Sequence, residues 1–182
     1  NRPVDTVVSP DGSRVYVANV FSGTVTVIDT ADNSVVATVA AGAGANAVDV
    51  AISRDGNRLY VVDSARATLS VIDTATNTVS GGIAVGGELG RVVLSPDGTR
   101  AYLTNGAIDG LTVIDTVTGT VVTTVSVGDS PAGAAISPDG NRVYVIHERD
   151  SVSVVDTVTN TVIDTVALGR ATTAPDEYPN AG

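Results

Sequence analysis

Aspartate is the side chain in this sequence whose spacing most suggests chemistry, because it recurs in two phrases. One phrase is Ser-Pro-Asp-Gly or a close variant, and the other is Ile-Asp-Thr or Val-Asp-Thr. Calcium-binding loops combine aspartate with glycine, but they gather several oxygen ligands within about a dozen residues. Here each loop provides one aspartate, so we interpret these residues as acceptors for backbone N–H groups in turns. We therefore predict no metal ligand and no cofactor. The repeated aspartates are Asp11, Asp55, Asp97 and Asp139 in the first phrase and Asp29, Asp73, Asp115 and Asp156 in the second.

Motifs for nucleophilic catalysis are missing from the sequence. It contains no cysteine, so a Cys nucleophile, a thiolate metal site and a disulfide are excluded. It contains one histidine, His147, and no Gly-x-Ser-x-Gly, His-Glu-x-x-His or P-loop motif. We predict no catalytic residue, and a non-enzyme is favoured over an enzyme.

The composition limits the class of partner. The chain has 182 residues, 43% of them apolar, which is enough to build a folded core. Its ten basic and twenty acidic residues give a net charge of −10. A phosphate-binding surface needs the opposite sign, so we predict no nucleic-acid partner. No run of about 18 apolar residues is present, so we predict no membrane insertion.

An internal repeat organises the sequence. Its longest phrase reads SPDGSRVYVAN in the first copy, and the four copies start 44, 42 and 42 residues apart. Four copies in phase predict repeated structural units, which we place at residues 1–44, 45–86, 87–128 and 129–169, followed by a tail or linker at 170–182. The copies of the phrase are Ser9–Asn19, Ser53–Asp63, Ser95–Asn105 and Ser137–His147.

Each unit reads as four short strands separated by turns. In the first unit we expect strands over Val4–Ser9, Arg14–Asn19 and Thr24–Asp29, and a fourth over the valine-rich Asn33–Val39. The chain holds 34 valines and 23 threonines, which favour strands, and no segment has a convincing helical period. Four strands in about 40–45 residues is the signature of a propeller blade. The predicted fold is all-β, a β-propeller of four four-stranded antiparallel blades that is either a closed four-blade ring or half or part of a larger ring.

Ring closure is the open question of this fold. An open arc would expose two valine-rich faces, a larger apolar patch than a soluble monomer usually leaves bare. The ring closes with four blades, or two chains join as half-rings, or the blades belong to a longer chain. Each unit runs from its first strand to its fourth, without the strand exchange that locks most rings. We therefore predict a homo-oligomer or part of a longer chain.

The repeated phrases resemble those of the YVTN-type β-propeller repeat family. Its naming tetrad stands at Tyr102–Asn105 as YLTN and at Tyr16–Asn19 as YVAN, and it drifts to YVVD at Tyr60–Asp63 and YVIH at Tyr144–His147. Members occur in archaeal surface-layer proteins and bacterial exported proteins. The resemblance implies an extracellular or cell-surface location, although no signal peptide is visible.

Function is expected where the units differ. Four residues before each repeated serine stand Asp5, Asp49, Arg91 and Gly133. Side chains alternate along a strand, so we expect one side of each first strand to be core and the other, with these residues, to line the central channel. Asp5, Asp49 and Arg91 would then ring the channel mouth. The alternative is that Arg91 simply neutralises the two aspartates.

The loops after the second strands also vary, and they emerge at the same end as the channel mouth. Loops on a rigid scaffold often bind partners. Phe21 is either an anchor for a partner or packed into a neighbouring blade. His147 is either a polar turn residue or a pH-sensitive spot beside Glu148 and Asp150. The candidate binding residues of this variable end are Asp5, Asp49, Arg91, Phe21, Asp63, Arg66, Asp109, His147, Glu148, Arg149 and Asp150.

Three functions fit these features. The favoured one is a non-catalytic binding or structural module of an exported or cell-surface protein, which uses the variable end and whose protein or small-molecule ligand stays open. The second is a lactonase- or lyase-like propeller enzyme, for which Asp5, Asp49 and His147 are the available groups at the channel mouth. The third is a structural protein that assembles into dimers or filaments through its blade faces.

Overall fold

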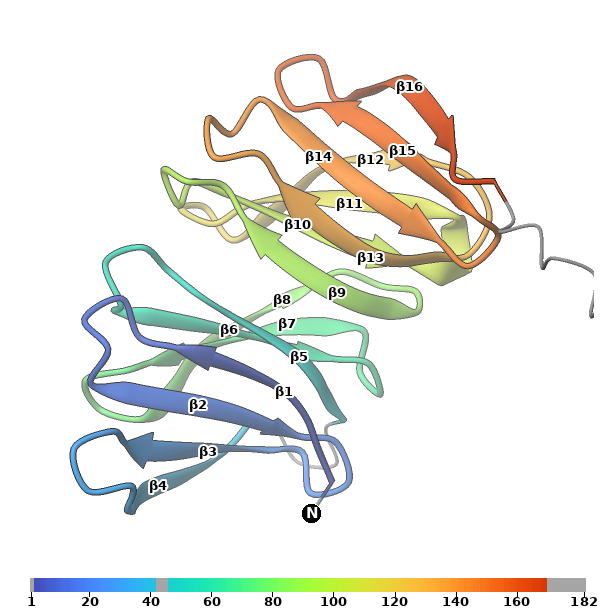
Figure 1. The fold of residues 1–182 in the computed structure, drawn as a ribbon. Helices are drawn as coiled ribbons and strands as arrows, with labels where there is room; N and C mark the ends of the chain where they lie inside the picture. The colour runs from blue at the N-terminus through green and yellow to red at the C-terminus, as the bar shows by residue number, and fades with distance from the viewer. Residues whose placement is uncertain (1, 42–45, 170–182) are drawn as a thin grey trace, which may run out of the picture.

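The computed structural model describes residues 2–41 and 46–169, which form four four-stranded sheets (Figure 1). In every sheet the strands follow chain order and pair antiparallel. The described residues contain no α-helix, only the 3-10 turn η1 (Gly106–Ile108). The predicted all-β architecture of four four-stranded antiparallel blades is therefore confirmed. None of the described residues forms a helix long and apolar enough to cross a membrane.

The sheets are named blades 1 to 4 in chain order. Blade 1 contains β1 (Pro3–Val8), β2 (Arg14–Asn19), β3 (Thr24–Asp29) and β4 (Val35–Ala40). Blade 2 contains β5 (Ala47–Ile52), β6 (Arg58–Asp63), β7 (Thr68–Asp73) and β8 (Thr78–Ala84). Blade 3 contains β9 (Leu89–Leu94), β10 (Arg100–Asn105), β11 (Gly110–Asp115) and β12 (Thr120–Ser126). Blade 4 contains β13 (Pro131–Ile136), β14 (Arg142–His147), β15 (Ser151–Asp156) and β16 (Thr161–Ala167).

The repeated Ser-Pro-Asp-Gly phrase forms the turn between the first and second strands of a blade. In blade 1, Gly12 has a φ of 75°, a backbone conformation that glycine adopts without steric cost. The Asp11 carboxylate accepts hydrogen bonds from the Ser9 hydroxyl at 2.6 Å and from the Ser13 backbone N–H at 3.0 Å. These bonds lower the pKa of Asp11 to about 2. The aspartate in this turn is thus a structural acceptor, as predicted.

The Asp-Thr phrase forms the turn between the third and fourth strands. Asp29 accepts a hydrogen bond from the Ala31 N–H at 2.8 Å and pairs with Arg14 on the neighbouring strand at 2.6 Å. Blade 4 repeats the ion pair between Arg142 and Asp156 at 2.6 Å. These turns fix the end of each blade that lies opposite the variable loops.

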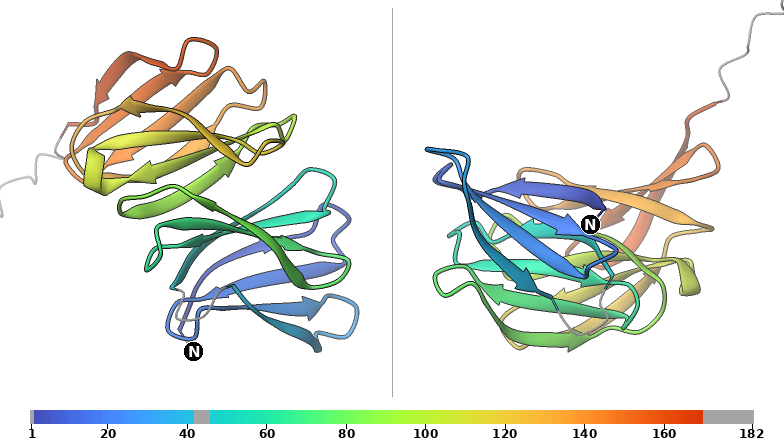
Figure 2. Two further views of the ribbon diagram at one scale, coloured as in Figure 1. Left: turned by 180° about the vertical axis from the view of Figure 1, so that it is seen from behind. Right: turned by 90° about the horizontal axis from the view of Figure 1, so that it is seen from below.

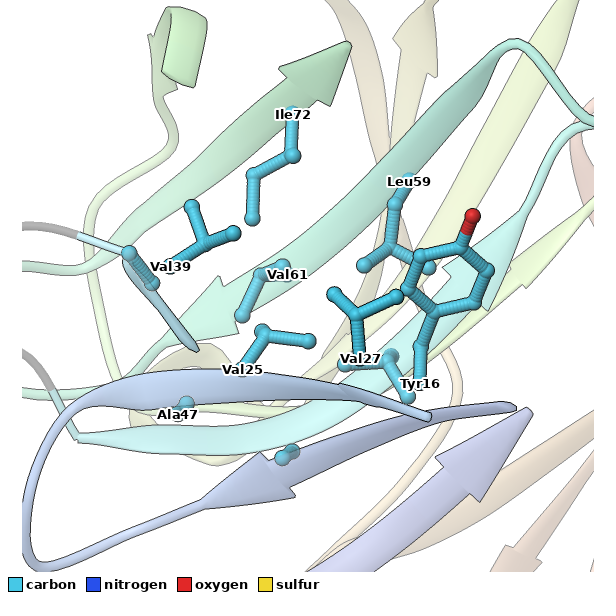
Figure 3. Packing of buried hydrophobic residues seen from close by; sticks show 11 residues of the cluster. Tyr16, Val25, Val27, Val39, Ala47, Leu59, Val61 and Ile72 are labelled. Atoms are coloured by element: carbon cyan, nitrogen blue, oxygen red, sulfur yellow. The ribbon is translucent and has the colours of Figure 1, made fainter. Parts of the chain in front are cut away.

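The hydrophobic core lies between the blades. Three apolar clusters fill the junctions between blades 1 and 2, 2 and 3, and 3 and 4. In the first junction, Tyr16, Val25 and Val27 of blade 1 face Leu59 and Val61 of blade 2 (Figure 3). Blades with valine-rich faces on both sides therefore pack face to face, and neighbouring first strands lie side by side.

The four blades form an open arc. Extensive contacts join β1 to β5, β5 to β9 and β9 to β13, but among the described residues no comparable contact joins β13 back to β1. Blades 1 and 4 lie at the two ends of the stack (Figure 2). The described residues leave the outer face of each terminal blade uncovered, and Tyr144 and Ile146 of blade 4 are 42% and 49% exposed.

Candidate functional site

The first strands of all four blades border one cavity on the inner side of the arc. Its volume is about 470 Å³, and its charged lining residues are Asp5, Asp49 and Arg91. Consecutive residues, such as Thr6 and Val7, also line it. The expected alternation between a core side and a lining side is therefore not observed. The reason is that the free edge of each first strand borders the cavity, while the faces of β5 and β9 pack against the blades on either side.

Arg91 bridges the two aspartates of the channel mouth. Its Nη1 lies 2.5 Å from Asp49 Oδ1 and 3.5 Å from Asp5 Oδ1. Three residues from three blades thus form one charged cluster with a formal charge of −1. This geometry favours the alternative in which Arg91 pairs with the two aspartates, although one negative charge remains.

The same carboxylates hold successive blades together. Asp5 Oδ2 accepts a hydrogen bond from the Val50 N–H of blade 2 at 3.0 Å. One repeat later, Asp49 Oδ2 accepts a hydrogen bond from the Val92 N–H of blade 3 at 2.7 Å. Bonds from backbone N–H groups to ionised carboxylates are stronger than neutral ones, so these residues tie the inner edges of the blades. The sequence offered no signal for this role, because each partner lies in the next repeat.

Asp49 is the electrostatically unusual member of the cluster. Its side chain is nearly buried, and burial raises its pKa to about 6, although the hydrogen bonds from Val92 and Arg91 act in the opposite direction. The hydrogen bond and the charge of Asp49 raise the pKa of Arg91 in turn. Asp49 can therefore exchange a proton in the mildly acidic range while both of its oxygens already have donors.

Several candidate residues lie on exposed loops at this end of the blades and do not line the cavity. Phe21 is 74% exposed, with the Arg2 guanidinium 5.7 Å from its ring centroid, so it is not packed into a neighbouring blade. The Arg149 side chain is 81% exposed and lies 3.9 Å from Asp129. Arg66, Asp109, Glu148 and Asp150 are also exposed.

Two candidates point into the blades. Asp63 is fully buried, and its Oδ1 accepts hydrogen bonds from the backbone N–H groups of Asn46 and Arg66. His147 is nearly buried, with Nδ1 3.1 Å from the Asp129 carbonyl oxygen and Nε2 2.9 Å from Ser153 Oγ.

The same slot in blade 3 holds Asn105, which contacts the preceding connector through Gly86 and Glu88. The last residue of each second strand in blades 2, 3 and 4 therefore fastens the chain that leads into its own blade. Among the described residues, no three His, Asp or Glu side chains lie close enough together to hold a metal ion.

Comparisons with known proteins agree on the fold. No protein-family model and no curated protein matches the sequence. Among solved structures, hydrazine synthase of Kuenenia stuttgartiensis superimposes with a TM-score of 0.84 at 27% identity, over 90% of this chain and 48% of that one. The β-propeller domain of Cps50 (Swd1) from Myceliophteria thermophila superimposes with a TM-score of 0.80 at 12% identity, over 93% of this chain and 56% of that one.

These matches define the class of protein. The chain is a β-propeller module of four blades, and it spans about half the length of the solved structures that it matches. One of them is itself a β-propeller domain, and the four blades cover 56% of that chain.

Proposed function

We propose that this chain is a non-catalytic binding module of the YVTN type, belonging to an exported or cell-surface protein, and that it binds its partner through the variable loops. The observation that carries the proposal is the contrast between the two ends of the blades. At the repeated end, the polar side chains are used in turns and ion pairs. At the variable end, Phe21 and Arg149 extend from the same rigid frame into solvent.

The exposed chemistry suits a protein surface with both apolar and acidic groups. Aromatic and arginine side chains are common anchors at protein interfaces. Phe21 lies beside Arg2, and Arg66 of blade 2 and Arg149 of blade 4 supply further positive charge on an acidic chain. Electrostatic complementarity of this kind selects partners and speeds their association.

The proposal is tested by substituting the variable end and measuring affinity for a partner isolated by pull-down with the wild-type chain. The variant Phe21→Ala with Arg149→Ala should bind that partner at least about tenfold more weakly, as expected when an interface loses its anchors. The matched control is Val117→Ala with Val158→Ala, which shortens two residues that are 76% and 80% exposed in turns of the repeated end. Unchanged binding by the first variant, or equal loss in the control, would contradict the assignment.

The enzyme alternative depends on Asp49, because its raised pKa would allow proton transfer near neutral pH. The expected partners do not converge, however, since His147 is buried in blade 4 and does not line the cavity with Asp5 and Asp49. We expect no turnover of lactone substrates. A turnover that Asp49→Asn abolishes would instead establish the enzyme.

The proposed location rests on the acidic composition and on the resemblance of the repeats to those of exported proteins. It is tested by treating intact cells that express the gene with an external protease. Rapid loss of the chain, with a cytoplasmic marker left intact, is the expected result. Protection of both would contradict a surface location.

A further inference from the structure

The junctions between blades reuse one apolar contact. The tyrosine of each second strand, with the residue two positions later, faces the following blade, and both are at most 3% exposed in blades 1, 2 and 3. These pairs are Tyr16 and Ala18, Tyr60 and Val62, and Tyr102 and Thr104. The opposite side of the second strand faces the preceding blade and is fully buried in blades 2, 3 and 4, as at Leu59, Leu103 and Val143.

A polar contact accompanies this packing. Burial raises the pKa of Tyr16 and of Tyr102, and an interaction with the side chain of Thr74 in blade 2 or of Thr157 in blade 4 acts in the opposite direction. In both junctions the threonine belongs to the Asp-Thr phrase of the following blade. In these two junctions the tyrosine of one blade therefore lies close to the threonine of the next blade.

A third contact joins the repeated turns at the first and the third junction. Pro10 of blade 1 lies 3.3 Å from the point where a Cβ would stand on Gly56 of blade 2. Pro96 of blade 3 lies 3.1 Å from the corresponding point on Gly140 of blade 4. Proline and glycine at these positions let neighbouring turns touch.

The two ends of the arc carry the unmatched halves of all three contacts. On blade 4, Tyr144 is 42% exposed, Ile146 is 49% exposed, and Pro138 is exposed. On blade 1, Val15 and Val17 are only half-buried, and Thr30 is exposed. No atom other than its chain neighbours lies within 4 Å of a Cβ placed on Gly12, which is also the case for Gly98 at the internal junction where Arg54 replaces the proline. Each exposed group at one end of the arc is thus of the kind that, at an internal junction, contacts a group found at the other end.

From this complementarity we propose that a second copy of the chain covers both end faces. Blade 4 of each copy packs on blade 1 of the other, with Tyr144 beside Thr30 and Pro138 against Gly12 of the neighbouring copy. Two arcs then close an eight-blade ring related by a twofold axis. Eight is within the range of about four to eight blades found in propellers, and twofold pairs are the commonest closed assemblies. This assembly is independent of the proposed binding function.

The mass of the chain in solution tests the proposal. Sedimentation equilibrium on the wild-type chain over a hundredfold range of concentration should give twice the chain mass of 18.2 kDa. A monomer at every concentration overturns the proposal, because the end faces would then be stable while uncovered. Masses that keep growing also overturn it, because head-to-tail contacts would then run on without closing.

Variants at each end distinguish this arrangement from a pairing of like faces. Tyr144→Arg and Val17→Arg should each give a monomer, because each places a charge in both junctions of the ring. Val117→Arg, at an exposed turn position away from the end faces, is the matched control and should stay dimeric. A dimer that survives either end variant overturns the head-to-tail contact, and circular dichroism verifies that each variant is folded.

Discussion

Asp49 shows how one residue can be structural and still sensitive to pH. Its carboxylate bonds to the Val92 N–H of the next blade and to Arg91, which would favour the charged form. Its burial favours the neutral form more strongly, so the pKa rises to about 6. The aspartates of the Ser-Pro-Asp-Gly turns are exposed and surrounded by donors, and the pKa of Asp11 and of Asp139 falls to about 2. Location within the blade therefore sets the direction of the shift.

We predict that Asp49 makes the folded chain less stable as the pH rises from about 4 to about 6. Its pKa in the folded chain lies above the ordinary value of 3.8, so the folded state binds its proton more tightly in this window. The resulting loss is at most about 3 kcal/mol, since one pKa unit corresponds to about 1.4 kcal/mol. Urea unfolding of the wild type and of Asp49→Asn at pH 4, 5 and 6 measures it.

Asp49→Asn should flatten the dependence, whereas Asp32→Asn should leave it unchanged. Asp32 is exposed and its pKa is lowered, so it titrates below this window. The turn aspartates act with the opposite sign, because stability that depends on their charge is lost as the pH falls through about 4 towards 2. Equal slopes in the wild type and in Asp49→Asn would exclude Asp49 as the cause.

At the scale of the element, the connectors between blades are fastened by side chains at the end of the second strands. His147 at the end of β14 contacts the connector carbonyl of Asp129, and it contacts Ser153 on β15. Ser153 in turn donates to the carbonyl of Val127 in the same connector. One residue thereby joins two strands and the segment that enters the blade.

We predict that Asn can replace His147 and that Leu cannot. Asn105 occupies the corresponding slot of blade 3 and donates to the Gly86 carbonyl, so His147→Asn should cost less than about 1 kcal/mol of unfolding free energy. His147→Leu leaves buried polar groups without partners and should cost about 1–3 kcal/mol. Urea unfolding of both variants gives the comparison. Equal stability of the two would show that the polar contacts do not hold the connector.

The strands were predictable from the sequence because strand formation depends on residues that are close together in the chain. The alternation of valine and threonine and the turn phrases placed strands at Arg14–Asn19 and Thr24–Asp29, where β2 and β3 lie. The first strand, expected at Val4–Ser9, is shifted by one residue to Pro3–Val8. The contacts of Asp49 and the inward orientation of His147 were not predictable. They depend on how one blade stacks on the next and on how the connector folds back, and a single repeat contains neither.

At the scale of the whole molecule, the arc behaves as a short stack in which each blade contacts only its neighbours. The stability of such a stack is a sum of terms for the blades and for the junctions between them. Blades 2 and 3 each have two junctions, whereas blades 1 and 4 each have one. Within one copy, the terminal blades should therefore open locally before the central ones.

Amide hydrogen exchange can measure this difference in local opening between terminal and central blades, and it can also test the proposed assembly. In Tyr144→Arg, which we expect to be monomeric, the amides of β2, β3, β14 and β15 should exchange at least about tenfold faster than those of β6, β7, β10 and β11, because a difference of about 1.4 kcal/mol in opening free energy gives that factor. In the wild-type chain at high concentration, a second copy adds a junction at both ends, so the difference should shrink, and dilution should restore it.

Val117→Arg should follow the wild type, because it leaves both end faces intact. Exchange that is uniform across the four blades in all three proteins would show that the junctions contribute little. Exchange that is fast at the ends in all three, at every concentration, would show that the end faces stay uncovered.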